Sequence, residues 1–324
     1  MKAAVYTRYG PPDVVSVKEI ETLTPKDNEV LIRVHATTVT TGDARVRALN
    51  LPTGFKLIGR LAIGISGPRQ PILGSELAGV IEAVGKSVTK FKVGDQVLAF
   101  TDAKLGCHVE YKTMPEDGAL ALKPARMSFE EAATLCFGGT TALHFFRKGN
   151  LQKGDKVLIV GASGGVGTAA VQLARHFGAE VTGVCSTENI DLVKSLGADS
   201  VIDYTRDDFT RNGKTYDIIM DTAGSAPFPR CKDSLKENGR LLVVLGGLPD
   251  ILRVPVVSMT SKKKVVAGPA WIPATDIPVL AGLAEAGEYK AVIDSRFPFD
   301  RIADAHTRVD AGHKKGNVVV TLVS

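Results

Sequence analysis

The sequence lacks the hallmarks of a membrane protein or a secreted disulfide-rich protein. No stretch approaches the roughly 18 consecutive apolar residues that a membrane-spanning helix needs. The first residues, Met1 to Tyr6, do not form the apolar core of a signal peptide. The chain has only four cysteines, far apart and without a C-x-x-C pair, which argues against a disulfide framework. We therefore expect a soluble cytoplasmic protein without a membrane span.

A strong excess of charge is also missing. The formal net charge is 40 − 35 = +5, and the only dense basic run, Lys262 to Lys264, directly precedes Val265 and Val266. This arrangement predicts a solvated turn before a strand rather than a nucleic-acid surface. With 324 residues, 44% of them hydrophobic, the chain is long enough for two domains with buried cores.

Glycine is concentrated in one turn, at 161–167, that lies between a predicted strand and a predicted helix. An apolar run at 157–160 is followed by the glycine-dense turn 161–167, a segment of helical periodicity to Phe177, and a second apolar run at 181–184. Strand, glycine turn, helix and strand form the context in which a glycine pattern predicts a dinucleotide site. Glycines let a pyrophosphate approach the backbone, and the start of the helix offers free N–H groups. The alternative is a glycine loop that only packs a helix on a sheet.

The rest of the chain separates into two patterns. Up to about residue 120, short strands bounded by glycine, such as 29–36, 77–85 and 93–100, predict a compact β-rich domain. From residue 156, strands and helices alternate for more than a hundred residues, which predicts a doubly wound parallel sheet. Ser128 to Glu131 predict a capping-box-like helix start. Within the alternating part we expect a helix from Glu188 to Leu196 and a strand at 241–245. A helix at 275–288 and a final strand from Asn317 to Val323 complete the prediction. The apolar and basic segment Phe55–Ser66 fits either a mobile flap or a surface helix packed on the strands.

Together these motifs resemble the medium-chain dehydrogenase/reductase superfamily, and within it the zinc-free quinone oxidoreductase-like group. The resemblance rests on the N-terminal residues 2–6, on Gly42-Asp43, on Gly74-Ser75-Glu76, on Gly138 to Ala142 and on the glycine turn. It implies an α/β fold with a GroES-like, partly closed β-barrel domain at 1–123, completed by 270–324. A Rossmann domain at 124–269 would bind the cofactor in the cleft between the two domains.

The resemblance also implies a lost metal site. Zinc members of the superfamily hold a catalytic zinc with two cysteines and a histidine, and here the three positions read Thr40, Ser75 and Cys136. One soft ligand out of three is not a zinc site, and only Cys107 lies where four cysteines would hold a structural zinc. We expect no metal. Cys136 would be a small apolar pocket residue or, alternatively, a reactive thiol.

The glycine turn and the following strand ends supply most of the predicted cofactor site. The resemblance adds Thr141 near the nicotinamide and Asn317 from the C-terminal segment. The predicted set is Thr141, Gly161, Ser163, Gly164, Gly165, Val166, Gly167, Ser186, Thr187, Tyr204, Gly246 and Asn317.

The end of the second strand of this unit bears on the choice of cofactor. An NAD site usually has an acid there, whereas this chain has Cys185-Ser186-Thr187. Small hydroxyl residues leave room for a 2′-phosphate, so we expect NADPH, with NADH as the alternative. Asn189 replaces the basic residue of many relatives, and Lys194 or Arg206 are possible substitutes.

For the reaction itself, the family pattern places Thr40, Asp43, Ser75 and Phe137 around the substrate. Asp43 is either a proton donor or a structural residue that caps a helix or pairs with Arg45 or Arg47. Without zinc, hydride transfer to a quinone or an α,β-unsaturated carbonyl is favoured over alcohol oxidation, because the charge delocalises to an oxygen that hydrogen bonds can stabilise.

We therefore expect an NADPH-dependent quinone or enone oxidoreductase that acts on a small-molecule substrate. The alternatives are a cofactor-binding sensor or interaction protein with little turnover and an alcohol dehydrogenase. A homodimer is implied by the resemblance alone.

Overall fold

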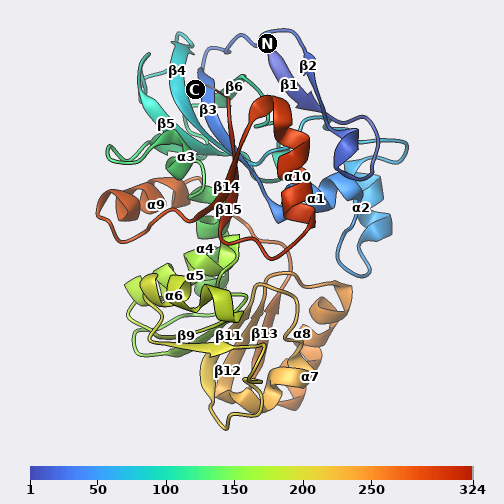
Figure 1. The fold of residues 1–324 in the computed structure, drawn as a ribbon, viewed down its shortest axis with the longest axis vertical. Coiled ribbons are helices and arrows are strands. Elements are labelled where there is room, and N and C mark those ends of the chain that lie inside the picture. The colour runs from blue at the N-terminus through green and yellow to red at the C-terminus, as the bar shows by residue number, and fades with distance from the viewer. Residues whose placement is uncertain (323–324) are drawn as a thin grey trace.

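The structure, a computed structural model, describes residues 1–322 and contains two large sheets (Figure 1). One sheet lies in the upper half of the view and the other in the lower half, and helix α4 (Cys136–Lys148) lies between them. A small antiparallel hairpin of β1 (Lys2–Val5) and β2 (Ser16–Glu19) flanks the upper sheet. No helix among residues 1–322 combines the length and the apolar character needed to cross a membrane.

The lower sheet has six parallel strands in the order β10-β9-β8-β11-β12-β13. The order reverses between β8 and β11, and a parallel α/β sheet binds its ligands at such a point. The strands are β8 (Lys156–Val160), β9 (Glu180–Cys185), β10 (Ser200–Asp203), β11 (Tyr216–Asp221), β12 (Leu235–Val243) and β13 (Lys264–Ala267). The helices are α5 (Gly165–His176), α6 (Ile190–Ser195), α7 (Phe228–Cys231) and α8 (Leu248–Thr260).

The upper sheet has seven strands in the order β14-β15-β3-β4-β5-β7, and β6 also pairs with β3. Strand β3 is long enough to pair with β4, β6 and β15, so it connects the N-terminal strands to the C-terminal segment. The strands are β3 (Glu29–Val39), β4 (Glu76–Val84), β5 (Gln96–Phe100), β6 (Tyr111–Pro115), β7 (Leu120–Leu122), β14 (Ile293–Pro298) and β15 (Asn317–Thr321). The helices are α1 (Thr41–Ala48), α2 (Lys56–Ile63), α3 (Phe129–Ala132), α9 (Asp276–Glu285) and α10 (Ile302–Asp310).

One hydrophobic core runs through α4 from the upper half to the lower half. It includes Ala78 and Leu98 of the upper sheet, Phe145 of α4, and Ile159 and Met220 of the lower sheet. Burial of this continuous apolar surface stabilises both halves and fixes their relative position. The ligand-binding edge of the lower sheet is therefore held against the upper half by packed side chains.

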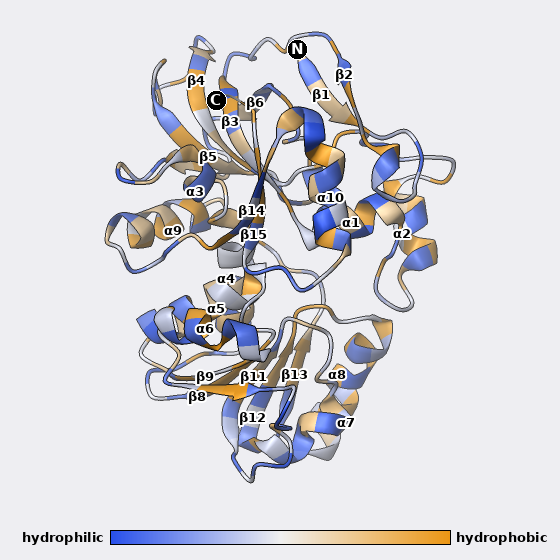
Figure 2. Ribbon diagram, viewed as in Figure 1, coloured by the Kyte–Doolittle hydropathy of each residue, from blue (hydrophilic) through white to orange (hydrophobic). Residues whose placement is uncertain are grey.

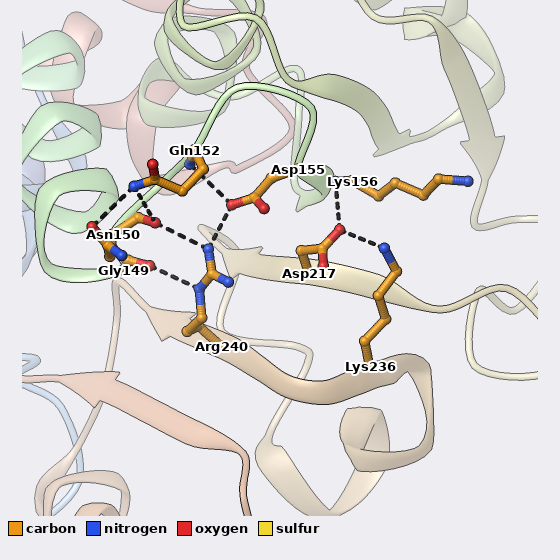
Figure 3. A network of polar contacts seen from close by, with 8 residues as sticks. All are labelled: Gly149, Asn150, Gln152, Asp155, Lys156, Asp217, Lys236 and Arg240. Atoms are coloured by element: carbon orange, nitrogen blue, oxygen red, sulfur yellow. Dashed lines mark hydrogen bonds and ion pairs between the residues drawn. The ribbon is translucent and has the colours of Figure 1, made fainter.

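Polar contacts close the opposite, amino-terminal edge of the lower sheet (Figure 3). Arg240 donates to the carbonyl oxygen of Gly149 at 2.8 Å and pairs with Asp155 at 2.5 Å. Asp217 accepts from the ammonium of Lys236 at 2.6 Å. Because this edge is occupied by internal ion pairs, the carboxyl-terminal edge is the one available to a ligand.

Most predicted elements are present, with shifted ends. The capping box predicted at Ser128 is confirmed: its hydroxyl accepts from the N–H of Glu131, whose carboxylate accepts from the N–H of Ser128. The strand predicted at 93–100 begins only at Gln96, and the strand predicted at 241–245 is longer on its N-terminal side. Residues 187–189 form a 3₁₀ turn before α6, although a continuous helix from Glu188 was predicted.

Two other predictions concern the ends of elements and domains. The final strand ends at Thr321, and Val323, which was included in the prediction, lies outside the described residues. The domain limits at 123/124 and 269/270 stay a prediction.

Candidate active site

The glycine turn between β8 and α5 has the shape that a pyrophosphate needs. Gly161 has a φ of 80°, a conformation that favours glycine. A Cβ on Gly167 would lie 2.0 Å from the carbonyl oxygen of Gly161, so any larger residue would push the helix away from the turn. A Cβ on Gly164 would meet nothing closer than 3.5 Å and would instead occupy the open space above the turn. The turn therefore leaves its backbone accessible from outside.

The first turn of α5 has no side-chain cap. Gly164 is the N-cap residue and has no side chain that could accept from the N–H groups of the next residues. Such unpaired N–H groups, together with the positive end of the helix dipole, form an anion site. The predicted residues Gly165, Val166 and Gly167 are the first three residues of this helix. The residues present thus fit a dinucleotide pyrophosphate.

The C-terminal segment lies directly on this turn. The N–H of Gly316 donates to the carbonyl oxygen of Ser163 at 2.8 Å. A Cβ on Gly165 would lie 3.0 Å from the Oδ1 of Asn317 and 3.3 Å from the Nζ of Lys314. Asn317, predicted from the resemblance, is therefore beside the glycine turn.

Lys314 was missed by the sequence analysis. Its ammonium donates to the carbonyl oxygen of Gly316 at 2.5 Å. Desolvation lowers the pKa of Lys314 to about 8, although Asp294 and Glu76 favour the charged form. A Lys in a tail of several charged residues carries no sequence signal for this position, which depends on how the tail folds back.

Asn189 connects the glycine turn with the end of β9. Its amide donates to the Oγ of Ser163 at 3.2 Å and to the Oγ of Ser186 at 3.0 Å. Both serine oxygens act as acceptors in these bonds, so both hydroxyl hydrogens stay available to a phosphate or ribose oxygen. From the sequence, Asn189 stands out only because it replaces a basic residue. The structure shows it as a buried residue that orients two predicted cofactor-site hydroxyls.

Thr187 is arranged differently from the prediction. Its hydroxyl donates to the carboxylate of Asp203 at 2.5 Å and is therefore not free for a 2′-phosphate. Asp203 also accepts from the hydroxyl of Thr205 at 2.7 Å, and these bonds lower its pKa. Arg206 lies 3.7 Å from this carboxylate and is largely exposed. Tyr204, also exposed, donates its N–H to the carbonyl oxygen of Cys185 and so lies beside the end of β9.

Thr40 and Asp43 form a capping box at the start of α1. The Oδ2 of Asp43 accepts from the N–H of Thr40 at 2.8 Å and from its hydroxyl at 2.6 Å. The Oδ1 accepts from the N–H of Gly74 at 2.8 Å. The proposed ion pair of Asp43 with Arg45 or Arg47 is wrong, because Arg47 pairs with Asp310 and Arg45 contacts no carboxylate within residues 1–322. The capping alternative accounts for the burial of Asp43.

Ser75 has the one hydroxyl of the predicted catalytic set that is not already committed. It is 5% exposed, and its Oγ has no hydrogen-bond partner in the part of the chain that the structure describes, residues 1–322. A buried hydroxyl without a partner carries a free-energy cost that a bound oxygen would remove. Thr40, by contrast, already donates to Asp43. The structure thus separates two residues that the sequence analysis treated alike.

Glu76 follows Ser75 and is fully buried. Its carboxylate accepts from the hydroxyl of Thr38 at 2.5 Å and from the N–H of Phe137 at 2.6 Å. Burial raises its pKa to about 7, and the charge of Asp43 adds to the effect while both hydrogen bonds oppose it. The carboxyl group of Glu76 therefore ties β4 to β3 and to the first turn of α4.

The remaining predicted residues lie on α4 and after the end of β12. Cys136 begins α4 and is fully buried, and burial raises its pKa well above the ordinary value, which disfavours the reactive-thiolate alternative. Thr141 donates to the carbonyl oxygen of Phe137 at 2.7 Å. Gly246 follows the end of β12, where an added Cβ would come within 3.3 Å of Ala267. Within residues 1–322, no three His, Cys, Asp or Glu side chains are arranged to hold a metal ion.

A cleft of about 490 Å³ opens between the two halves. Arg45, Leu51 and Thr53 line it on the upper side. The lower side is formed by residues that follow β11 and β12, among them Gly224 and Leu245. It therefore lies at the carboxyl-terminal edge of the lower sheet, where ligands of parallel α/β sheets bind.

Comparison with known proteins gives consistent results. Residues 26–125 match the family described as "Alcohol dehydrogenase GroES-like domain", and residues 196–320 match "Zinc-binding dehydrogenase". The chain is 34% identical to the 2-methylene-furan-3-one reductase of Solanum lycopersicum, over 99% of this chain and 79% of that protein. It is 33% identical to the chloroplastic NADPH-dependent alkenal/one oxidoreductase of Arabidopsis thaliana, again over 99% and 79%.

The solved structures agree. The quinone oxidoreductase from Coxiella burnetii superposes with a TM-score of 0.86 at 26% identity, with 99% of each chain covered. The chain belongs to the medium-chain dehydrogenase/reductase superfamily and is quinone oxidoreductase-like. The predicted fold class, a GroES-like domain combined with a Rossmann sheet, is confirmed.

Proposed function

We propose that this protein reduces a quinone or an α,β-unsaturated carbonyl compound with NADPH and without zinc. The observation that carries the proposal is the uncapped, glycine-rich start of α5 at the carboxyl-terminal edge of the lower sheet. The buried Ser75 hydroxyl of the upper half, which has no hydrogen-bond partner within residues 1–322, adds to it. The names of the two plant relatives, a furanone reductase and an alkenal/one oxidoreductase, support the same class of acceptor.

The chain supplies a binding surface for the cofactor in three parts. The first turn of α5 would receive the pyrophosphate, with Ser163 and Ser186 donating hydroxyl hydrogens to neighbouring oxygens. Lys314, beside Gly165, would add positive charge next to the pyrophosphate. Asn317 and Thr141 complete the proposed set. When bound, NADPH supplies the hydride.

On the acceptor side, the hydroxyl of Ser75 is the group free to donate to the substrate oxygen. Hydride addition to a conjugated carbon places negative charge on that oxygen, and a preorganised donor stabilises it. Asp43 and Thr40 hold the loop around Gly74 through their hydrogen bonds and so position Ser75. We assign them a positioning role.

The absence of zinc is part of the proposal. Thr40, Ser75 and Cys136 occupy the three ligand positions, and only a cysteine is a strong zinc ligand. The hydroxyl of Thr40 is engaged with Asp43, and the pKa of Cys136 is raised, so neither favours a metal. Elemental analysis of the purified protein tests this point, and one zinc per chain would reject it.

For the choice between NADPH and NADH, the exposed guanidinium of Arg206 is the main support. It follows the end of β10 and lies 3.7 Å from the Asp203 carboxylate, which also accepts from the hydroxyl of Thr187 at the end of β9, and it could pair with a 2′-phosphate there. The carboxylate of Asp203 faces Thr187 and Thr205 rather than open space, so it does not take the role of the ribose-binding acid of an NAD site.

A turnover assay separates the candidate functions. Purified protein is mixed with NADPH and a panel of quinones, enals and enones, and the nicotinamide absorbance is followed. Tight NADPH binding without turnover on any acceptor would reject the enzyme proposal in favour of a sensor or interaction protein. Oxidation of simple alcohols with NADP⁺, together with bound zinc, would favour the alcohol dehydrogenase alternative.

The predicted homodimer stays a proposal. Among residues 1–322, strand β13 pairs only with β12 and leaves one edge of the lower sheet open, and the adjacent α8 exposes Leu252 and Met259. A second copy of the chain paired along this edge would cover both features. Sedimentation velocity of the purified protein tests the proposed homodimer.

The cytoplasmic location also stays a proposal, and cell fractionation tests it.

A further inference from the structure

Helix α2 is the part of the chain that the proposed reaction does not use. It coincides with the insertion that the sequence left open between a flap and a surface helix packed on the strands. The structure shows a helix, but most of its large apolar side chains are exposed. Leu57 is 75% exposed, Ile58 57%, Leu61 53% and the following Ile65 60%. No residue of α2 is buried.

The exposure of these side chains is built into the way the helix is attached. Gly59 faces Leu51, and a Cβ at this glycine would lie 2.0 Å from the Cδ1 of Leu51. At the end of the helix, the hydroxyl of Tyr9 donates to the carbonyl oxygen of Gly64 at 2.8 Å. The guanidinium of Arg69 donates to the carbonyl oxygen of Ala62 at 3.3 Å. The glycine side is thus held inward and the aliphatic side faces outward.

The charged residues of the segment that contains this aliphatic surface have one sign. From Ala44 to Ser75 the sequence contains five basic residues and no acidic residue. Arg47 is buried and paired with Asp310. The other four, Arg45, Lys56, Arg60 and Arg69, have no carboxylate within ion-pair distance in residues 1–322. Hydrophilic and hydrophobic residues both appear on the ribbon of α2 (Figure 2).

We propose that α2 and Ile65 form a docking surface for an anionic membrane. Aliphatic side chains on an amphipathic helix enter the boundary between headgroups and acyl chains, and neighbouring cations are attracted to acidic lipids. A protein partner of ordinary composition would not require a segment without acidic residues. An anionic bilayer matches both the aliphatic side chains of α2 and the basic residues of this segment. The exposed face of α8, by contrast, carries an internal ion pair between Asp250 and Arg253.

The position of the surface gives docking a consequence for the substrate. Leu51, Pro52 and Thr53, which line the cleft, directly precede α2. A docked molecule would hold the mouth of the cleft beside the bilayer, where apolar quinones and long-chain enals concentrate. This consequence rests on the proposed function, but the docking does not.

Cosedimentation of the full chain with lipid vesicles tests the docking. We expect binding to phosphatidylcholine vesicles that contain phosphatidylserine, weaker binding at high salt, and none to pure phosphatidylcholine vesicles. Leu57→Ser with Leu61→Ser should reduce the partition coefficient at least tenfold, and Lys56→Gln with Arg60→Gln should reduce it at least threefold. Leu122→Ser with Val279→Ser, which changes two other exposed aliphatic side chains, is the matched control and should bind like the unmodified protein.

Three results would overturn the proposal. The first is no binding of the unmodified protein to the anionic vesicles, and the second is an equal loss in the control variant. The third is a smaller sedimenting mass of the Leu57→Ser, Leu61→Ser variant than of the unmodified protein, measured without vesicles. That result would show that the surface is an interface with a second copy of the chain. Thermal melting and turnover of a water-soluble quinone verify that each variant is folded. If no acceptor is turned over, the proposed function fails while the vesicle result still decides the docking.

Discussion

The N–H of Gly316 donates to the carbonyl oxygen of Ser163 at 2.8 Å, which fixes the C-terminal segment to the glycine turn. This contact joins the turn after β8 to the segment just before β15, which are about 150 residues apart in the chain. It also positions Lys314 next to Gly165. A cofactor bound at the turn would therefore meet side chains from both the lower sheet and the tail.

Ser75→Ala is expected to lower kcat/KM for the acceptor about a hundredfold, because it removes a preorganised donor to the developing oxyanion. Steady-state kinetics on a quinone or enone measures the change. Stability should not fall, since the hydroxyl has no partner to lose. Thr101→Val is the matched control: its hydroxyl donates to the carbonyl oxygen of Ser75, so the change is close to the site but leaves the Ser75 hydroxyl intact. Full activity of Ser75→Ala would contradict the assignment.

Lys314 should make cofactor binding depend on pH. The pKa of Lys314 is lowered to about 8, so the side chain is charged below this pH and neutral above it. We expect kcat/KM for NADPH to fall as the pH rises through about 8, because an ammonium that faces the anionic cofactor is lost. Lys314→Met should lower kcat/KM for NADPH about tenfold near neutral pH, and the pH profile of this variant should lack the fall at about pH 8.

Lys315→Met provides the control for this prediction, because it removes the neighbouring lysine and keeps Lys314. Its pH profile should match that of the unmodified protein. A profile of Lys314→Met that retains the transition would show that another group is responsible.

Glu76 should make the stability of the protein depend on pH. Its pKa is about 7 in the folded protein and has an ordinary value of 4.5. Between these values the folded chain binds more protons than the unfolded chain, so stability falls as the pH rises through this window. The loss is of the order of 3 kcal/mol from this residue. Glu76→Gln should remove it, since an amide keeps an acceptor for the N–H of Phe137 without a charge.

Urea unfolding at pH values below and above this window measures the effect. Relative to the unmodified protein, Glu76→Gln should gain stability on going from the lower to the higher pH. Glu237→Gln, at an exposed carboxylate that pairs with Lys262, should show no such gain. Parallel pH dependences of the Glu76→Gln variant and the unmodified protein would disprove the assignment.

Arg206→Ala is expected to raise the KM for NADPH about tenfold and to leave the KM for NADH unchanged, because only NADPH carries the 2′-phosphate. Stability should hardly change, since the Arg206 side chain is 74% exposed and its contact with Asp203 is long, at 3.7 Å. Kinetics with both cofactors measures the ratio. Arg211→Ala, at another exposed arginine of the same loop region, is the control. Equal effects on NADPH and NADH would locate the 2′-phosphate elsewhere.

Local sequence patterns predicted a large part of this protein. The alternation of apolar runs and helical periodicity from residue 156 onward predicted the parallel sheet, because buried strands and amphipathic helices have different hydrophobic periods. The glycine turn predicted the start of α5, and Ser128 with Glu131 predicted a capping box. Each of these features depends on residues that are close together in the chain.

Other features needed the tertiary structure. Asp43 reaches Gly74, Glu76 reaches Phe137, and Thr187 reaches Asp203, and no local pattern specifies such partners. From the sequence alone, Ser75 and Thr40 were equivalent members of the predicted pocket. Only their surroundings separate the engaged hydroxyl of Thr40 from the hydroxyl of Ser75, which has no partner within residues 1–322.

The same distinction between local and tertiary determinants applies to the glycine turn, to Lys314 and to α2. The sequence by itself determined that a glycine turn begins a helix in a βαβ unit, because backbone conformation and hydrophobic period are local properties. Only the tertiary structure decided that Lys314 lies on that turn and that the aliphatic face of α2 points away from the core. Both depend on how distant segments pack, and packing determines which side chains are buried, charged or left exposed.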